Sequence, residues 1–201
     1  HIIFDNFFNP DFLSLVEREF PDLARIKDSQ KYANEAEIKF ATKRGDTQQP
    51  KVIKDLMRYL NSHEFLDFLQ ALTSIDESLI PDPHFLGAGL HQIKRGGLLK
   101  VHADFCRHQD TKLDRRINML IYLNKDWEKS YGGELQFWDK EVKKCQKKIL
   151  PIFNRVVIFN TNDFTYHGHP DPLTCPEKRT RKSLALYYFS NGRPSIELRP
   201  S

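Results

Sequence analysis

The sequence predicts a mainly β protein, an antiparallel sandwich or barrel with helices packed on one outer face. From Phe85 onward, short runs of apolar or β-branched residues alternate with Gly, Pro, Asn and Asp, and no helix-length segment separates them. Before that point, apolar residues recur mostly at helical spacing, with short strands among the helices. A length of 201 residues fits one domain, with helical support over 1–85, a β core over 86–193 and a tail over 194–201.

Three helices are expected in the first part of the chain. The first begins with Asn9 as the N-cap and Pro10 in the first helical position. The second begins at Pro50, and the third follows Ser62 as its N-cap. Between the first two helices, residues 41–49 are polar and include a glycine, which predicts a loop that is either a plain connection or a lid.

Six strands are expected in the later part, each bounded by turn-forming residues. They are Leu86–Lys94, Leu98–Asp104, Ile117–Leu123, Gly133–Trp138, Arg155–Phe159 and Ser183–Phe189. The basic stretch Lys143–Lys148 is better interpreted as a solvated hairpin edge than as a binding patch. An edge strand near Gln136 either supports a dimer or is covered by a loop, so the oligomeric state stays open.

Composition excludes several classes of protein. A hydrophobic fraction of 39% and a mean hydropathy of −0.59 are too high for a disordered chain and too low for a membrane protein. The net charge of +4 is spread along the chain, which is weak support for a nucleic-acid partner. Three scattered cysteines argue against a disulfide framework or a zinc cluster, and predict a reducing, cytoplasmic location.

The pattern His-x-Asp occurs three times, beginning at His102, His108 and His169. On a strand, residues two apart face the same side, so such a pair can place an imidazole and a carboxylate on one metal ion. Only the pair His102 and Asp104 follows a strand-like run. The pair at His108 lies in a charged loop and the pair at His169 is flanked by prolines, so the first pair is the candidate metal site.

A third ligand must come from elsewhere in the chain. His167 follows a predicted strand and its turn, and His169 is a rival for the same role. Two imidazoles and one carboxylate on one face of an octahedral ion leave three positions open, which suits non-haem Fe(II) and oxygen chemistry. A closed structural zinc site would want four ligands.

Arg181 and Ser183 open the last predicted strand on the same face. An arginine inside a barrel is costly unless an anion pairs with it. A guanidinium and a hydroxyl presented together suit the distal carboxylate of a dicarboxylic acid. The alternative is an arginine at the strand end that points to water.

The order of these motifs along the chain resembles that of the Fe(II)- and 2-oxoglutarate-dependent dioxygenases: His102-x-Asp104, then His167, then Arg181-x-Ser183. The resemblance is specifically to the prolyl hydroxylase superfamily, which includes prolyl 4-hydroxylases and hypoxia-type prolyl hydroxylases. The resemblance covers roughly residues 87–193.

Two further segments carry the resemblance. Ile121–Trp127, followed by Gly132–Leu135, is similar to the part of hypoxia-type prolyl hydroxylases in which a tyrosine contacts the 2-oxoglutarate carboxylate. Pro151–Phe159 resembles the strand that leads to the distal histidine ligand.

The resemblance implies a double-stranded β-helix, or jelly-roll barrel, with the N-terminal helices on one face. It also implies that His102, Asp104 and His167 bind Fe(II). Arg181 would anchor the distal carboxylate of 2-oxoglutarate and Tyr122 would hydrogen-bond it. The implied activity is hydroxylation of an unactivated C–H bond with O2, giving succinate and CO2, with ascorbate as a reductant.

Two weaker assignments follow from the same resemblance. Ser183 is a further candidate for the distal carboxylate. Gln92 lies where many relatives keep a tyrosine or another polar residue near the co-substrate. Because position 104 keeps its carboxylate, the ligand set favours hydroxylation over halogenation.

Substrate identity stays open among a peptidyl proline, a free amino acid, a sugar and another small molecule. An apolar wall from Leu120, Phe159, Leu184 and Leu186 is expected to exclude water from the site. Phe105–Arg116 and residues 41–49 are expected to border the entrance. The arginines in these two segments suggest an anionic or carbonyl-rich substrate, although solvated loop charge is the simpler interpretation: Arg44, Arg107, Arg115 and Arg116.

Two other functions compete. A nucleic-acid demethylating dioxygenase would share the metal set, but it would need a basic groove with stacking aromatics, and the cations do not cluster that way. A non-enzymatic jelly-roll binding module leaves the order of the motif residues unexplained.

Overall fold

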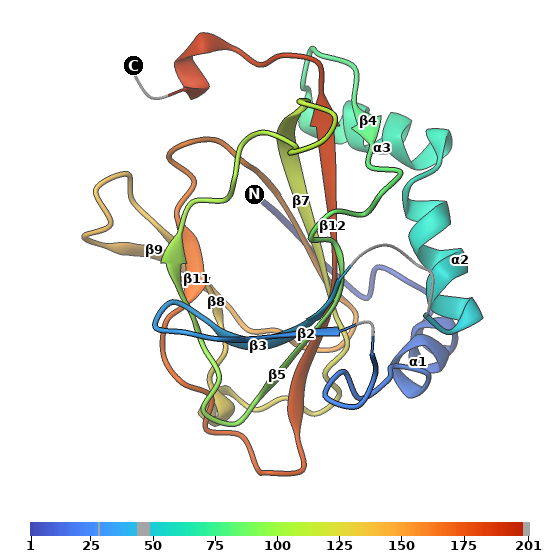
Figure 1. Cartoon of the computed structure of the whole chain (residues 1–201), viewed down its shortest axis with the longest axis vertical. Helices are drawn as coiled ribbons and strands as arrows, with labels where there is room; N and C mark the ends of the chain where they lie inside the picture. Colours follow the sequence, from blue (N-terminus) through green and yellow to red (C-terminus); the bar gives the residue numbers. More distant parts are fainter. Residues whose placement is uncertain (28, 44–48, 199–201) are drawn as a thin grey trace.

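A computed structural model describes residues 1–27, 29–43 and 49–198 (Figure 1). Its helices are α1 (Pro10–Arg18), α2 (Lys51–Leu60), α3 (His63–Thr73) and the short 3-10 helices η1 (Lys129–Tyr131) and η2 (Ser195–Glu197). None of the helices in these ranges has the length and apolar character needed to cross a membrane. Residues 41 and 42 belong to a strand, β3 (Ile38–Thr42), rather than to the expected loop. Residues 44–48, including Arg44, lie outside the described residues, so the choice between a plain connection and a lid is not tested.

The larger sheet has eight strands in the described chain. Their order is β1 (Ile2–Asp5), β10 (Arg155–Asn160), β7 (Asp114–Tyr122), β12 (Thr180–Ser190), β5 (Gly89–Lys94), β3 (Ile38–Thr42) and β2 (Ser29–Ala33), with β4 (Ile80–Pro81) paired to β12. All the pairings are antiparallel. The helices α1 to α3 cover one side of this sheet (Figure 1).

The smaller sheet has four strands and lies on the other side of the larger sheet from the helices (Figure 1). Its order is β6 (Leu99–His102), β11 (His167–His169), β8 (Leu135–Trp138) and β9 (Cys145–Ile149). Two facing antiparallel sheets with helices on one outer face confirm the predicted jelly-roll class. The interior between the sheets holds the polar residues discussed below.

The helix starts agree with the sequence prediction. The side-chain oxygen of Asn9 accepts hydrogen bonds from the backbone N–H groups of Asp11 and Phe12, at 2.9 and 3.1 Å. Ser62 accepts one from Phe65 at 3.4 Å. The helix at Pro50 has no side-chain cap, and its start depends on the fixed φ of that proline. These caps satisfy backbone donors that have no partner inside the helix.

All six predicted strands are present with shifted ends. The first begins at Gly89 rather than Leu86, because Phe85 and Gly87 have φ values of 48° and 72°, which a strand does not accommodate. The hairpin edge predicted at Lys143–Lys148 is β9, the last strand of the smaller sheet. The edge predicted near Gln136 is wrong, because β8 is hydrogen-bonded on both sides, to β11 and β9.

A bulge in β7 decides which arginine faces the interior. In the pairing with β12, Tyr188 is opposite Ile117 and Phe189 is opposite Arg115. Arg116 is therefore the extra residue of the bulge, with no residue of β12 opposite it. Residues three apart on a regular strand face opposite sides, but the extra residue brings Arg115 and Asn118 to the same side. Both arginines are buried, at 1% and 3% exposure, so interpreting them as solvated loop charges is wrong.

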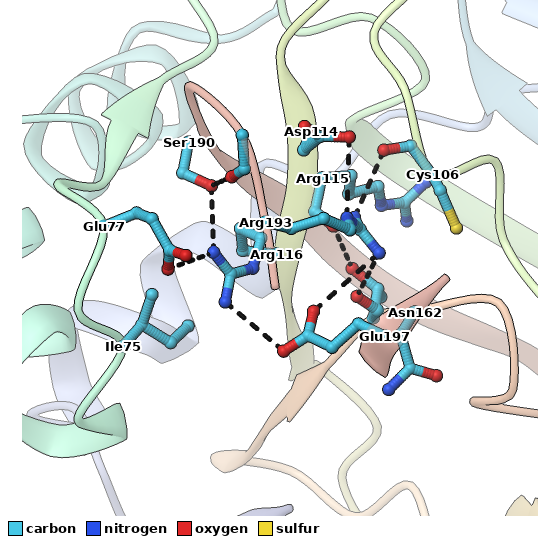
Figure 2. A network of polar contacts seen from close by, with 12 residues as sticks. Ile75, Glu77, Cys106, Asp114, Arg115, Arg116, Asn162, Ser190, Arg193 and Glu197 are labelled. Carbon is cyan, nitrogen blue, oxygen red and sulfur yellow. Dashed lines mark hydrogen bonds and ion pairs between the residues drawn. The ribbon is translucent and has the colours of Figure 1, made fainter. Parts of the chain in front are cut away.

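Arg116 turns away from the interior into a polar network that fastens the C-terminal segment (Figure 2). Its guanidinium donates to Glu77 at 2.5 Å, to Ser190 at 3.1 Å and to Glu197 of η2 at 3.4 Å. The hydrogen bond and charge of Arg116 lower the pKa of Glu77. Arg193 adds an ion pair to Asp114 at 3.5 Å. The segment after β12 is thereby tied to the start of β7, beside the residues that face the interior.

Candidate active site

Three potential metal ligands converge between the two sheets. His102 ends β6, Asp104 follows two residues later, and His167 begins β11 directly opposite His102 in the antiparallel register. One ligand atom from each residue lies within 4.8 Å of those of the other two. The register of two strands therefore brings together residues that are far apart in the sequence.

Both histidines are held in one orientation by backbone carbonyls. Nδ1 of His102 lies 2.8 Å from the carbonyl oxygen of Lys100, and Nδ1 of His167 lies 3.1 Å from that of Thr165. A carbonyl only accepts, so each Nδ1 carries the proton. Each Nε2 is then free to bind a metal, and the two lie 3.6 and 3.3 Å from the carboxylate oxygens of Asp104.

Asp104 is the acidic group of the cluster, and two side chains of β7 bind the same oxygen. Asn118 donates a hydrogen bond to Oδ2 at 2.7 Å, and Arg115 forms an ion pair with it at 3.2 Å. Burial alone would raise the pKa of Asp104, but the charge of Arg115 and the neighbouring histidines outweigh it and hold that pKa well below its usual value. The carboxylate is therefore ionised and oriented, as a metal ligand requires.

The two imidazoles differ in their protonation. Burial lowers the pKa of His167 to about 4, so this ring is neutral near neutral pH. Burial also acts on His102, but the hydrogen bond and charge of Asp104 outweigh it and raise the pKa of His102. One neutral imidazole, one imidazole that can lose a proton and one carboxylate form a donor set suited to a divalent transition metal.

Arg181 and Tyr122 lie together in the interior, on neighbouring strands β12 and β7. Nη2 of Arg181 donates to the Tyr122 hydroxyl at 3.3 Å, and Nε donates to the carbonyl of Gly133 at 2.9 Å. Gly133 has a φ of +74°, and a Cβ there would stand 2.9 Å from Cδ of Arg181. A glycine is therefore required beside the arginine. Arg181 is 5% exposed, so the prediction of an interior arginine rather than one pointing to water agrees with the structure.

One cavity joins the metal cluster to Arg181, and several polar residues that the sequence analysis did not select line it. The expected residues on its wall include Ser183, Leu120 and Phe159. The polar residues not singled out from the sequence are Lys39, His91 and Asn118, whereas Arg115 was expected only near the entrance and His169 only as a rival metal ligand. Strand alternation alone could have found His91, since it lies two residues before Ile93, which also lines the cavity.

Gln92 points away from this cavity. It lies between His91 and Ile93 on β5, so its side chain is on the opposite face. Its oxygen accepts from the backbone of Leu23 at 2.9 Å, and its nitrogen donates to Thr180 at 3.2 Å. Both ends of the amide are therefore used to fasten the segment after α1 to the sheet. The expected position of Gln92 near the co-substrate differs from its place in the structure.

The expected apolar wall is also only half correct. Leu184 and Leu186 belong to the core between the larger sheet and the helices, because they alternate with Ser183 and Tyr187, which face the cavity.

The second His-x-Asp pair has a structural role. His108 is 1% exposed and its Nε2 lies 3.3 Å from Asp82, which is also buried. Its Nδ1 accepts hydrogen bonds from the backbone of Asp110 and Thr111, both at 3.1 Å. The ring thus fixes the turn that follows the metal cluster, and Asp110 is not paired with it through a metal.

The fold and the site define an Fe(II)- and 2-oxoglutarate-dependent oxygenase. A family described as "2OG-Fe(II) oxygenase superfamily" matches residues 88–189. The chain belongs to this superfamily, and the family together with the donor set of His102, Asp104 and His167 implies Fe(II) and 2-oxoglutarate.

The chain is similar in sequence to part of one prolyl hydroxylase. It is 26% identical over 98 residues to the mouse (Mus musculus) protein "Prolyl 3-hydroxylase OGFOD1"; the match covers 47% of this chain and 17% of that protein.

Solved prolyl hydroxylases share the fold. A Pseudomonas putida prolyl-4-hydroxylase has a TM-score of 0.66 at 17% identity, covering 96% of this chain and 92% of its own. A Trichoplax adhaerens prolyl hydroxylase, solved with a peptide of the hypoxia inducible factor oxygen degradation domain, has a TM-score of 0.69 at 21% identity, covering 94% and 83%.

Proposed function

We propose that this enzyme binds Fe(II) through His102, Asp104 and His167 and hydroxylates a prolyl residue in a peptide. The observation that carries the proposal is one cavity that contains both this donor set and Arg181, whose guanidinium donates to the Tyr122 hydroxyl. Bound together, Fe(II) and 2-oxoglutarate supply the chemistry that converts O2, 2-oxoglutarate and a C–H bond into succinate, CO2 and an alcohol. The residues of the chain bind, orient and shield these reactants.

Arg181 holds the distal carboxylate of 2-oxoglutarate in this proposal. Burial lowers the pKa of Arg181, although the Tyr122 hydroxyl opposes this effect, so the pair provides a desolvated cation with a hydroxyl beside it. A buried guanidinium that has no carboxylate partner among the described residues favours binding an anion. Ser183, 2% exposed on the same strand, offers a further hydroxyl in the cavity.

The metal ligands keep their orientation through the hydrogen bonds to Lys100, Thr165 and Asn118. Side chains fixed in this way would hold Fe(II), and three protein ligands would leave positions for further ligands. Leu120 and Phe159 lie on the cavity wall and exclude water from the reacting atoms.

A second hollow on the outer side of the metal cluster is the proposed substrate site. Tyr32, Phe105 and Tyr187 contribute aromatic surface to it, beside His102 and Asp104. Phe105 is 45% exposed, which leaves its ring available to a ligand. Aromatic walls suit a pyrrolidine ring, and the open side accommodates the flanking peptide.

The charges around this hollow do not favour a nucleic acid. Its two cations are already paired, Lys39 with Glu37 at 2.8 Å and Arg115 with Asp104 at 3.2 Å. A nucleic-acid groove needs unpaired cations along the backbone path.

The three cysteines are unpaired, which supports the expected reducing, cytoplasmic compartment as part of the proposal.

The test is a peptide screen under anaerobic loading and timed O2 addition. Fe(II), 2-oxoglutarate and ascorbate are present, and succinate release and peptide mass are measured together. We expect prolyl peptides to stimulate succinate release and to gain one oxygen atom on proline, with no gain in the Asp104→Ala variant. Stimulation by methylated nucleic acid or a free small molecule, without oxygen gain in any peptide, would contradict the prolyl assignment.

A further inference from the structure

His169 is an unpartnered polar side chain inside the cavity. It is 3% exposed, and neither Nδ1 nor Nε2 has a hydrogen-bond partner among the residues that the structure describes. It lines the same cavity as Arg181 and Ser183. An imidazole always carries at least one N–H, and a buried N–H without an acceptor is destabilising. Such a group in a cavity wall indicates a ligand that supplies the acceptor.

The backbone of β11 explains why this side chain lies in the cavity. The strand shifts register between His167, opposite His102, and His169, opposite Leu99. A Cβ on the intervening Gly168 would stand 2.8 Å from the carbonyl oxygens of Leu99 and Lys100, so only glycine allows this close pairing. Because residues two apart on a strand face the same side, and the extra residue of the shifted pairing lies on β6, both histidines line one wall.

The two histidines then have different surroundings. The imidazole of His167 faces Asp104 within the metal cluster. His169 does not belong to that cluster, and it lines the cavity together with Arg181. It therefore shares one cavity with the proposed metal ligands and the proposed carboxylate anchor, where 2-oxoglutarate would bind.

We propose that His169 binds 2-oxoglutarate by donating a hydrogen bond from its imidazole N–H to a ligand oxygen. This inference rests on the proposed function, because it uses the placement of the co-substrate between the metal cluster and Arg181. A dianionic ligand needs several donors, and the imidazole N–H of His169 adds one to those of Arg181. His169 is then a binding residue rather than a metal ligand, which gives a role to the histidine that rivals His167 in the sequence.

The experiment compares His169→Val with His169→Gln. Valine removes the donor and suits a strand, whereas glutamine keeps an N–H of similar reach. Binding of 2-oxoglutarate is measured by titration calorimetry on Mn(II)-loaded protein, with Mn(II) stoichiometry and urea unfolding of the metal-free protein as separate readouts. His84→Val, at an exposed histidine, is the matched control.

We expect His169→Val to bind 2-oxoglutarate about tenfold to a hundredfold more weakly. His169→Gln should recover most of that loss, and Mn(II) stoichiometry should be unchanged. Because valine removes an unpartnered buried group, the metal-free variant should be at least as stable as wild type, which a merely structural role would not produce. His84→Val should match wild type throughout.

Unchanged 2-oxoglutarate affinity in His169→Val would overturn the inference, and so would loss of Mn(II) binding, which would make His169 a metal ligand. If the valine variant does not fold, His169→Met repeats the comparison with a flexible side chain of similar size. Failure of wild type to bind 2-oxoglutarate would instead overturn the proposed function, so the two failures are distinguishable.

Discussion

Replacing Arg115 should lower the free energy of unfolding of the metal-free protein and raise its affinity for a divalent metal. Arg115 is buried, forms an ion pair with Oδ2 of Asp104 at 3.2 Å, and stacks over the Tyr187 ring at 3.4 Å. In the metal-free state its charge compensates the buried carboxylate. A bound divalent ion supplies the same compensation and is repelled by the guanidinium. Arg115 and the metal therefore compete electrostatically for one carboxylate.

The size of the effect follows from these contacts. Removing one partner of a buried ion pair costs about 3–5 kcal/mol, and we take the lower end because Asn118 still donates to Asp104. In Arg115→Met, contact between the thioether and the aromatic rings offsets the lost cation–π contact. If bound metal restores about 2 kcal/mol of this loss, the variant binds metal roughly thirtyfold more tightly than wild type.

Asn118 is the control, because it binds the same oxygen without a charge. Asn118→Ala removes no charge but takes away the neutral donor to Asp104 and the acceptor for Nε of Arg115 at 2.8 Å, so the carboxylate loses orientation and metal affinity should fall about tenfold to a hundredfold. Mn(II) binding by electron paramagnetic resonance and urea unfolding with and without Mn(II) measure both variants. Weaker Mn(II) binding in Arg115→Met would refute the reasoning, since orientation would then outweigh charge at Asp104.

Three further predictions concern the proposed ligands. Arg181→Met should weaken 2-oxoglutarate binding about a hundredfold, with Mn(II) still bound. The affinity of Arg181→Lys should lie between those of wild type and Arg181→Met, because lysine keeps the charge but lacks the guanidinium fork. Equal affinity of all three proteins in a calorimetric titration would mean that another group anchors the carboxylate. His102→Ala and Asp104→Ala should abolish Mn(II) binding while circular dichroism stays native, and a retained Mn(II) signal in both would remove these two ligands. Burial would lower the pKa of His102, but the hydrogen bond and charge of Asp104 outweigh it and raise that pKa. Below this pKa, the imidazole must lose a proton before it can bind the metal. Mn(II) affinity should therefore fall about tenfold per pH unit below that pKa, whereas a flat profile would show that His102 is neutral before binding.

The sequence was sufficient for the fold class and for the pairing of His102 with Asp104, but it left His167 and His169 as rivals for the third ligand. Alternation places His102 and Asp104 on one side of a strand, and a turn signal precedes His167. Side chains alternate between the two faces of a strand with a period of two residues, and strand pairing preserves this alternation. The interior position of Arg181 was predictable for a similar reason, because the small and apolar residues after it indicate a buried strand.

The residues around the cluster were not predictable in the same way. Arg115 reaches Asp104 only because a bulge shifts the side-chain alternation of β7, and nothing local in the sequence marks the residue that is left over. Gln92 shows the opposite error, since a resemblance placed it near the co-substrate while the strand period places it on the helix side. Lys39 enters the cavity from β3, a strand whose register depends on long-range pairing to β5.

The bulge and the C-terminal network together explain how one strand serves two purposes. Arg115 and Arg116 are adjacent, yet the first faces Asp104 and the second is tied to Glu77 and Glu197 (Figure 2). Any shift of β7 that moved Arg115 out of the cavity would also pull Arg116 from its two carboxylates, and leave buried charges unpaired. The outer network therefore stabilises the register on which the inner one depends. Contacts outside the cavity thus determine the charge beside the proposed metal ligand.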